Sequence, residues 1–211
     1  MFEGWIASPM ANLFSNALTT LARVKLRLNI PTLTTTWDTL IENLINGATA
    51  FIEGETGRSF KSATVTNELY SLDFGQTLVT LRRWPVASIS TIEYRTGSVG
   101  SPTWVAVPAN DYELIGDGKQ GVLKIYNGIW GPNCLRVTYV AGYVIDFTTE
   151  ANHLPQELSD LCERLAAARF KKRESEGKDQ ESAQEVSITW SKGLNDDDKA
   201  LIRRYIRSAF V

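Results

Sequence analysis

The chain has 211 residues, and its 22 basic and 24 acidic side chains give a net charge of −2 at neutral pH. Such a balanced charge argues against a general nucleic-acid binder, because those proteins gain their affinity by neutralising phosphates. No apolar run approaches the ~18 residues that a membrane-spanning helix needs, and no positively charged leader segment is present. We therefore expect no membrane partner, and a protein that acts in a cytoplasm or in something assembled there.

Residues that commonly carry catalysis are scarce. The single histidine, His153, has no partner in a motif, and metal-binding spacings such as H-E-x-x-H or paired C-x-x-C are missing. The chain also lacks a nucleophile elbow and a phosphate-binding P-loop. Cys134 and Cys162 stand alone, and we interpret them as packing residues in a reducing compartment. The sequence thus predicts no catalytic, cofactor-binding or metal-binding residues and a protein that is not an enzyme.

Residues 1–18 form an apolar N-terminal arm with few charges. Apolar residues recur there at helical spacing, which indicates a helix from Pro9 onward. We expect the arm to pack on its own domain or on a neighbouring molecule, because an exposed apolar arm lowers solubility. A short helix follows and ends near Leu28 or Asn29, since a helix rarely continues into a residue such as Pro31.

The strongest helical pattern lies between Trp37 and Gly57. Its apolar residues follow the i, i+3, i+4, i+7 spacing of one helix face. Thr35 and Asp38 are spaced as a capping pair at its start, and Gly57 suits the left-handed residue that ends many helices. With the preceding short helix it makes a predicted helix pair over residues 19–60.

Between residues 61 and 150 the pattern changes to short runs of β-branched and aromatic residues separated by turn residues. These runs predict an antiparallel meander or a small sandwich, since parallel strands need crossover helices between them. The predicted strand residues are 65, 69–72, 78–81, 89–94, 104–107, 112–115, 122–126 and 135–140.

One segment of this region, from Gly116 to Gly121, matches the G-x-G-x-x-G pattern of dinucleotide-binding loops. That fingerprint requires a helix after the loop, so that the phosphates sit at the helix N-terminus. The residues that follow here, VLKIYNG, indicate another strand. We therefore interpret the segment as a hairpin loop.

Helix is predicted again over residues 151–174. Residues 175–194 are polar and indicate a mobile loop with a short strand at 186–190. A last helix over residues 195–211 opens with Asn195 and three aspartates, which suit an N-cap and the positive end of the helix dipole. The predicted fold class is α+β, a helical bundle into which the antiparallel β module is inserted.

Two sets of residues near the end of the chain are candidate interaction sites. Apolar residues on one face of the last helix are typical of a helix that docks into a groove on another protein; they are Leu201, Ile202, Tyr205, Ile206 and Phe210. Basic residues cluster towards the ends of the last two helices, where the helix dipole alone favours positive charge. They also suit a nucleic-acid path or an acidic partner; they are Arg169, Lys171, Lys172, Arg173, Arg203, Arg204 and Arg207.

Three segments of the chain together resemble the head-tail connector, or adaptor, proteins of long-tailed bacteriophages and prophages. The first is LTTLARVKLRLNI with LIENLINGATAFIEGETGR, which is similar to the opening helix pair of that family and its Thr-Gly-Arg turn. The second is LRRWPVASISTIEYR with LRVTYVAGY, which resembles its Pro-Val strand entry and V-x-Y-x-x-G-Y strand. The third runs from LPQELSDLCERLAAARFKKRES to the terminal helix. The chain departs from the family in residues 1–18, in Ile206 after Tyr205 and in a longer β insertion.

The resemblance implies a structural virion protein without enzymatic activity or cofactor. Such proteins form a homo-oligomeric ring, a dodecamer, beneath the portal protein and extend the DNA channel towards the tail. The implied location is the head-tail neck of a virion assembled in the bacterial cytoplasm. The implied partners are the portal, neighbouring copies, a stopper or tail-completion protein, and passing DNA through transient non-specific contact. The last helix is then expected to dock on the portal.

Two other interpretations remain open at this stage. One is a stopper or tail-completion protein of the same neck, although such proteins are usually shorter and mostly β. The other is a glycan-binding β module, in which exposed tryptophans such as Trp104 and Trp130 stack on sugars.

Overall fold

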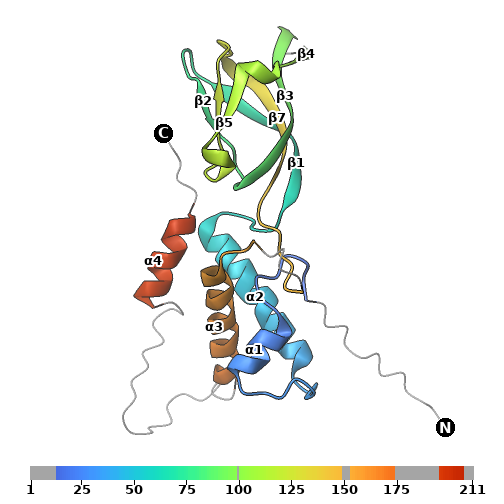
Figure 1. Cartoon of the computed structure of the whole chain (residues 1–211), viewed down its shortest axis with the longest axis vertical. Helices are drawn as coiled ribbons and strands as arrows, with labels where there is room; N and C mark the ends of the chain where they lie inside the picture. The colour runs from blue at the N-terminus through green and yellow to red at the C-terminus, as the bar shows by residue number, and fades with distance from the viewer. Residues whose placement is uncertain (1–12, 99, 149–152, 174–194, 207–211) are drawn as a thin grey trace, which may run out of the picture. The chain divides into compact units, whose positions relative to one another are not determined.

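The computed structural model describes residues 13–98, 100–148, 153–173 and 195–206. The predictions for residues 1–12, for the loop with its strand at 186–190, and for Arg207 and Phe210 lie outside these ranges. The chain divides into two compact units (Figure 1). One unit is helical and joins the residues up to 58 with those from 145 to 206, and the other is β-rich and spans 59–144. The fold is α+β, as predicted.

Four helices of the described residues form the helical unit; they are α1 (Leu21–Arg27), α2 (Asp38–Thr56), α3 (Gln156–Lys172) and α4 (Asp196–Tyr205). Helix α2 packs on α3 through the apolar face that the sequence predicted, with Ile41, Ile45 and Ile52 fully buried. Gly57 ends α2 in the left-handed conformation, with φ at 64°, which confirms the predicted stop.

The segment before α1 is not helical from residue 13 onward, so the helix predicted from Pro9 is wrong in its described part. Side chains of α2 take the hydrogen bonds that a helix would have made internally. The N–H of Phe14 donates to Asn46 Oδ1 at 2.9 Å, and the N–H of Leu18 donates to Thr49 Oγ1 at 3.2 Å. Helix α1 starts only at Leu21, after its N-cap.

The predicted capping pair at the start of α2 is also wrong. Trp37 occupies the N-cap position without a side-chain bond, and Asp38 instead forms an ion pair with Lys25 of α1. The Lys25 ammonium is buried and also donates to the carbonyl oxygens of Thr32, at 3.2 Å, and Thr34, at 2.8 Å. One buried lysine therefore fastens the loop between α1 and α2 to both helices.

A second polar cluster joins α1 to α3. The carboxylate of Glu163 is buried in the middle of α3 and accepts a hydrogen bond from Thr19 Oγ1 at 3.1 Å. The guanidinium groups of Arg23 and Arg27 approach its two oxygens at 3.4 Å each. Arg27 also pairs with Asp160 of the same helix. Charge pairing thus positions α1, whose buried apolar contribution is confined to Val24.

The β unit contains seven strands among the described residues; they are β1 (Ala63–Leu72), β2 (Leu78–Thr80), β3 (Val86–Ser98), β4 (Ser101–Ala106), β5 (Tyr112–Ile115), β6 (Val122–Ile125) and β7 (Gly131–Ala141). They form a four-stranded sheet in the order β1-β7-β3-β4 and a three-stranded sheet in the order β2-β6-β5, with antiparallel pairing between neighbours. Residues of both sheets share one apolar core, in which Leu123, Leu135 and Val137 are fully buried. The sequence left open a meander or a small sandwich, and the two antiparallel sheets correspond to the sandwich.

The G-x-G-x-x-G segment connects two paired strands, β5 and β6, which confirms the hairpin interpretation. Gly118 in this loop has φ at 74°, and a Cβ atom at this position would overlap the carbonyl oxygen of Val86 in β3. The glycine is therefore required by close packing of the loop on the neighbouring strand.

Two tyrosine hydroxyls of the four-stranded sheet share the carboxylate of Glu68. The hydroxyls of Tyr70 and Tyr139 both donate to Glu68 Oε2, from Tyr139 at 2.6 Å. Each hydroxyl also accepts a backbone N–H at 3.2 Å, from Arg82 and Arg83 respectively. Burial, with the hydrogen bond to Glu68 as the next cause, raises the pKa of Tyr139 to about 12. The cluster fixes the connection between β2 and β3 to the four-stranded sheet.

Replacement of Lys25 by alanine tests how far the α1–α2 connection depends on this ammonium. We expect Lys25→Ala to lower the free energy of unfolding by about 2–4 kcal/mol, because Asp38 and two carbonyl oxygens lose a buried partner. Chemical denaturation measures the change. Lys119→Ala, which removes an exposed lysine, is the matched control and is expected to change stability by less than about 0.5 kcal/mol. Equal effects of the two substitutions would contradict the assigned role.

The two cysteines provide a second test, because both are buried and free, as packing residues should be. Burial raises the pKa of the Cys162 thiol to about 12, and its sulfur lies 3.6 Å from Thr49 Oγ1. At pH 8 the reactive thiolate is therefore a minute fraction of this residue. We expect a thiol reagent to modify Cys162 only at the rate of unfolding, and rapid reaction of the folded protein at this residue would contradict its placement.

Candidate interaction surfaces

Helix α4 attaches to the helical unit mainly through polar contacts at its two ends. Asn195 caps it by accepting the Asp198 N–H at 2.6 Å, as predicted, and the Asp198 carboxylate pairs with Arg164 of α3. At the other end, the Tyr205 hydroxyl donates to Glu157 of α3. Arg204 lies 3.5 Å from the same carboxylate. Arg58 also donates to the Tyr205 carbonyl oxygen at 3.3 Å, and these contacts together with the buried Ile202 hold the helix.

The predicted docking residues of α4 differ in their exposure. Ile202 is only 4% exposed, because it packs within its own helical unit, and Leu201 and Tyr205 are half-buried. Ile206, just after the helix, is 44% exposed. Ile202 and Ile206 contribute to a cavity of about 200 Å³ between α2 and α4, together with Glu55, Lys199 and Arg203. Contact of the whole predicted set with a partner therefore requires α4 to leave α2.

The predicted basic residues do not form one free patch. Arg173 is half-buried, stacks on Trp37 with its Cζ 4.8 Å from the ring centre, and donates to the carbonyl of Phe170 at 2.7 Å, so it caps α3. Arg169 is exposed and lies over Phe51 at 5.8 Å. Three more members are exposed; they are Lys171, Lys172 and Arg203. Arg204 is exposed but paired with Glu157, as described above.

The single histidine and the aspartates in the first turn of α4 are not gathered with other candidate ligands in the described residues. His153 is exposed on the loop before α3, and Asp196 pairs with Lys199 at 2.9 Å. Within the described ranges, no three His, Cys, Asp or Glu side chains are placed to hold a metal ion. No helix in those ranges is long and apolar enough to cross a membrane.

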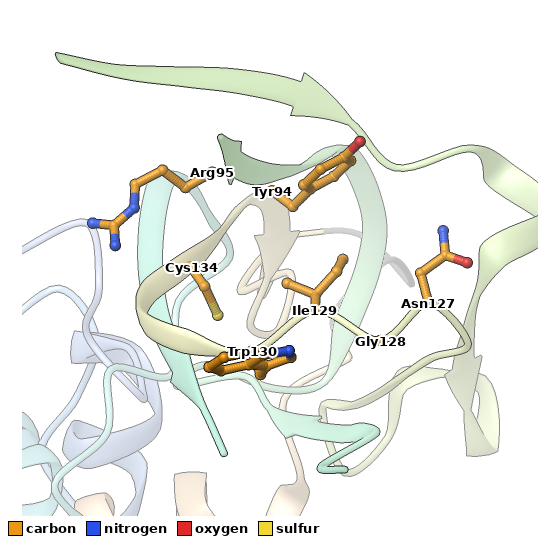
Figure 2. A pocket seen from close by; sticks show the side chains of 7 residues that line it. All are labelled: Tyr94, Arg95, Asn127, Gly128, Ile129, Trp130 and Cys134. Atoms are coloured by element: carbon orange, nitrogen blue, oxygen red, sulfur yellow. The ribbon is translucent and has the colours of Figure 1, made fainter. Parts of the chain in front are cut away.

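The β unit has a pocket of about 360 Å³ that sequence analysis did not predict (Figure 2). Figure 2 shows Tyr94 on one side and Trp130 on the other, with Ile129 and Cys134 between them. Arg95 extends away from the other side chains, and Asn127 lies beyond Ile129, next to Gly128. Gly128 completes the lining. The lining is mixed, with the rings of Tyr94 and Trp130 and the side chain of Ile129 as apolar surface and Asn127 and Arg95 as polar groups.

The loop that carries the pocket is held by its own hydrogen bonds. Asn127 Nδ2 donates to Asp111 Oδ2 at 2.8 Å, and the N–H of Tyr126 donates to the Asp111 carbonyl at 2.9 Å. The Tyr126 hydroxyl donates to Glu113 at 2.6 Å. Trp130 remains 61% exposed and meets Phe74, which is 85% exposed, edge to face at 5.8 Å between ring centres. The pocket and its aromatic neighbours are therefore preformed.

The other tryptophan singled out in the sequence has a structural role. Trp104 of β4 is half-buried, and the guanidinium of Arg136 lies over its ring at 4.5 Å. Arg136 is held in place by two hydrogen bonds to Glu93, at 2.5 and 3.0 Å. Those bonds lower the pKa of the Glu93 carboxyl. The ring of Trp130 is open to stacking by a sugar, whereas Arg136 already covers one face of the Trp104 ring.

The two units, a helical bundle and an inserted antiparallel sandwich, define a fold that is found in known particles. No family model and no curated protein matches the chain. Solved structures do match. A chain from the neck of an empty gene transfer agent (GTA) particle, computed with C6 symmetry, is 20% identical, with a TM-score of 0.58 and 93% of each chain covered. A chain from the virion of a native GTA particle is 18% identical, with a TM-score of 0.53 and 95% of each chain covered. A chain from the neck of a native GTA particle, computed with C12 symmetry, is 16% identical, with a TM-score of 0.53 and 93% of each chain covered. This chain therefore has the same fold as these proteins over nearly its whole length.

Removal of the Glu157 carboxylate tests the attachment of α4. Glu157→Ala deletes the partner of both Tyr205 and Arg204, and we expect amide exchange in residues 196–205 to become about five-fold faster, because surface contacts of this kind contribute about 1 kcal/mol. Hydrogen exchange with mass spectrometry measures it. Asp197→Ala removes an exposed acid from the first turn of α4 and is the matched control, with a smaller expected effect. Unchanged exchange in Glu157→Ala would show that α4 is held by other contacts.

Proposed function

We propose that the protein is a structural component of a phage-type neck, a head-tail connector that forms a ring under the portal and extends the DNA channel to the tail. The observation that carries this proposal is a shared fold that includes both units, 93–95% of this chain, with proteins from GTA necks and virions. The order of the three resembling sequence segments supports it independently. We further propose that the protein catalyses no reaction and acts within the virion.

Ring formation sets a requirement on the subunit surface. In a cyclic assembly each copy contacts its two neighbours through two different surfaces, so contact surfaces need not be self-complementary. C6 and C12 symmetry belong to two of the matched neck structures. For this chain we propose a ring of the same kind, with neighbouring copies, the portal and a stopper or tail-completion protein as partners.

Helix α4 is the proposed contact with the portal. Its release from α2 and α3 exposes Ile202, whose burial contributes about 1.5–3 kcal/mol. It also breaks the contacts to Glu157, which contribute about 1 kcal/mol or less each, and the ion pair of Asp198 with Arg164. A standard-sized interface offsets such a loss readily. The free helix would then present its apolar face, including Leu201 and Tyr205, to a groove on the portal.

Exposed basic residues at the end of α3 and on α4 are the proposed contacts with passing DNA; they are Arg169, Lys171, Lys172 and Arg203. DNA must slide through a channel, so a few exposed charges in a nearly neutral protein suit transient contact better than a strongly basic surface. Arg173 is excluded from this role because it caps α3.

Two variants test the portal contact. Deletion of residues 195–211 is expected to abolish association with purified portal rings while the remaining chain stays folded, as measured by mass photometry and circular dichroism. Ile206→Asp, which alters an exposed residue, is expected to weaken association at least ten-fold without a change in melting temperature. Val105→Asp, at a 38% exposed position on β4, is the control that should still bind.

The result also separates the possible roles in the neck. Portal binding by the deletion variant at the level of the full chain would contradict docking through α4. A full chain that binds tail tubes and never portal rings would overturn the connector role and favour a tail-completion protein.

A further inference from the structure

The pocket between Tyr94 and Trp130 has no assigned occupant, although it is preformed. Its loop is fixed by the hydrogen bonds of Asn127 and Tyr126 to β5 and the turn before it, so ligand binding is not needed to shape it. Large exposed aromatic groups such as Trp130 and Phe74 mark interaction sites when they are contiguous on a surface. The site therefore calls for a partner that covers apolar surface.

The lining determines the chemistry of that partner. Two aromatic rings face an apolar floor of Ile129 and Cys134, and Figure 2 shows the Trp130 indole nitrogen and the Tyr94 hydroxyl on the side where Asn127 lies. Aromatic side chains prefer such edge and face contacts, and the three polar groups can bond a peptide backbone. A volume of about 360 Å³ is at the small end of ligand sites, enough for one large side chain and the backbone beside it.

We propose that the pocket receives the N-terminal arm, residues 1–12, of a neighbouring copy in the ring, with the Trp5 side chain between Tyr94 and Trp130. This inference rests on the proposed connector function, which supplies the neighbour. The arm sequence, MFEGWIASPMAN, is mostly apolar, with Glu3 as its one charged side chain. Such a segment needs a surface to cover it, and the pocket offers the rings of Tyr94 and Trp130 together with Ile129.

The arm's sequence also suits the loop that lines the pocket. Gly4, next to Trp5, carries no side chain, so the arm backbone can approach Gly128 of the loop closely. Arg95 takes no part in this contact, because its side chain extends away from the other lining side chains.

The length and attachment of the arm permit an exchange between copies. The arm leaves the described chain before Phe14, whose N–H is bonded to Asn46 on α2. The eight steps from Trp5 to Leu13 span at most about 28 Å when extended. In a ring each copy donates an arm to one neighbour and receives one from the other, which is a heterologous contact. Assembly on the portal raises the effective concentration of the arm to the millimolar range, so a weak pocket is sufficient.

Photo-crosslinking of the full chain tests the proposal. A benzoylphenylalanine replaces Trp5, equal amounts of isotopically light and heavy chains are mixed, and rings are assembled on portal before irradiation. We expect crosslinks to residues 94–95 or 127–134, with about half of them joining a light to a heavy chain. Crosslinks only within one chain, crosslinks to other surfaces, or none would overturn the proposal.

Two further measurements complete the experiment. Trp130→Ala is expected to reduce the crosslink at least ten-fold, whereas Leu78→Ala, at a 48% exposed position of the same unit outside the pocket, should leave it unchanged. Mass photometry of the wild-type chain with portal separates the two levels of inference. A ring without the crosslink overturns arm exchange alone, whereas the absence of any ring overturns the connector function and arm exchange with it.

Discussion

The carboxylate of Glu163 is the contact on which the position of α1 depends. It lies inside α3, away from water, and its two oxygens are satisfied by Thr19, Arg23 and Arg27. Arg23 and Arg27 are about one third exposed, so loss of either costs less than the about 3–5 kcal/mol of a fully buried pair. Helix α1 has only seven residues and would not be stable alone. Its place in the fold is therefore set by electrostatics, while α2 and α3 are joined by apolar packing.

The two proposed contact surfaces differ in how much they must change on assembly. Helix α4 has to give up the burial of Ile202 before its apolar face can meet a partner, so portal binding would be coupled to a local rearrangement. The pocket beside Trp130 is already shaped by Asn127 and Asp111 and needs only an incoming segment. A protein with one adaptable surface and one rigid surface can stay unassembled in solution and still form specific contacts once its partners are present.

Periodicity predicted most of the fold, because the apolar face of α2 and the short strands of the sandwich are local patterns with distinct repeats. The errors arose where side chains distant in the sequence bind groups that the prediction had paired locally. Asn46 and Thr49 capture the N–H groups of the segment that was predicted to be a helix, and Lys25 captures the predicted capping aspartate. The pocket was missed for a related reason. Tyr94 and Trp130 are brought together by the register of β3 and β7, which no pattern within either segment encodes.

The packing of Gly118 against β3 has a consequence for the evolution of this fold. Any side chain there would collide with the carbonyl of Val86, so selection should retain glycine in relatives that keep the hairpin, whatever else diverges. The retained residue would lie in a string that imitates a nucleotide-binding fingerprint. Among relatives of this protein, an invariant glycine at this position would reflect the close approach of the loop to β3. A motif search that equates invariance with ligand binding would wrongly assign a nucleotide to this loop.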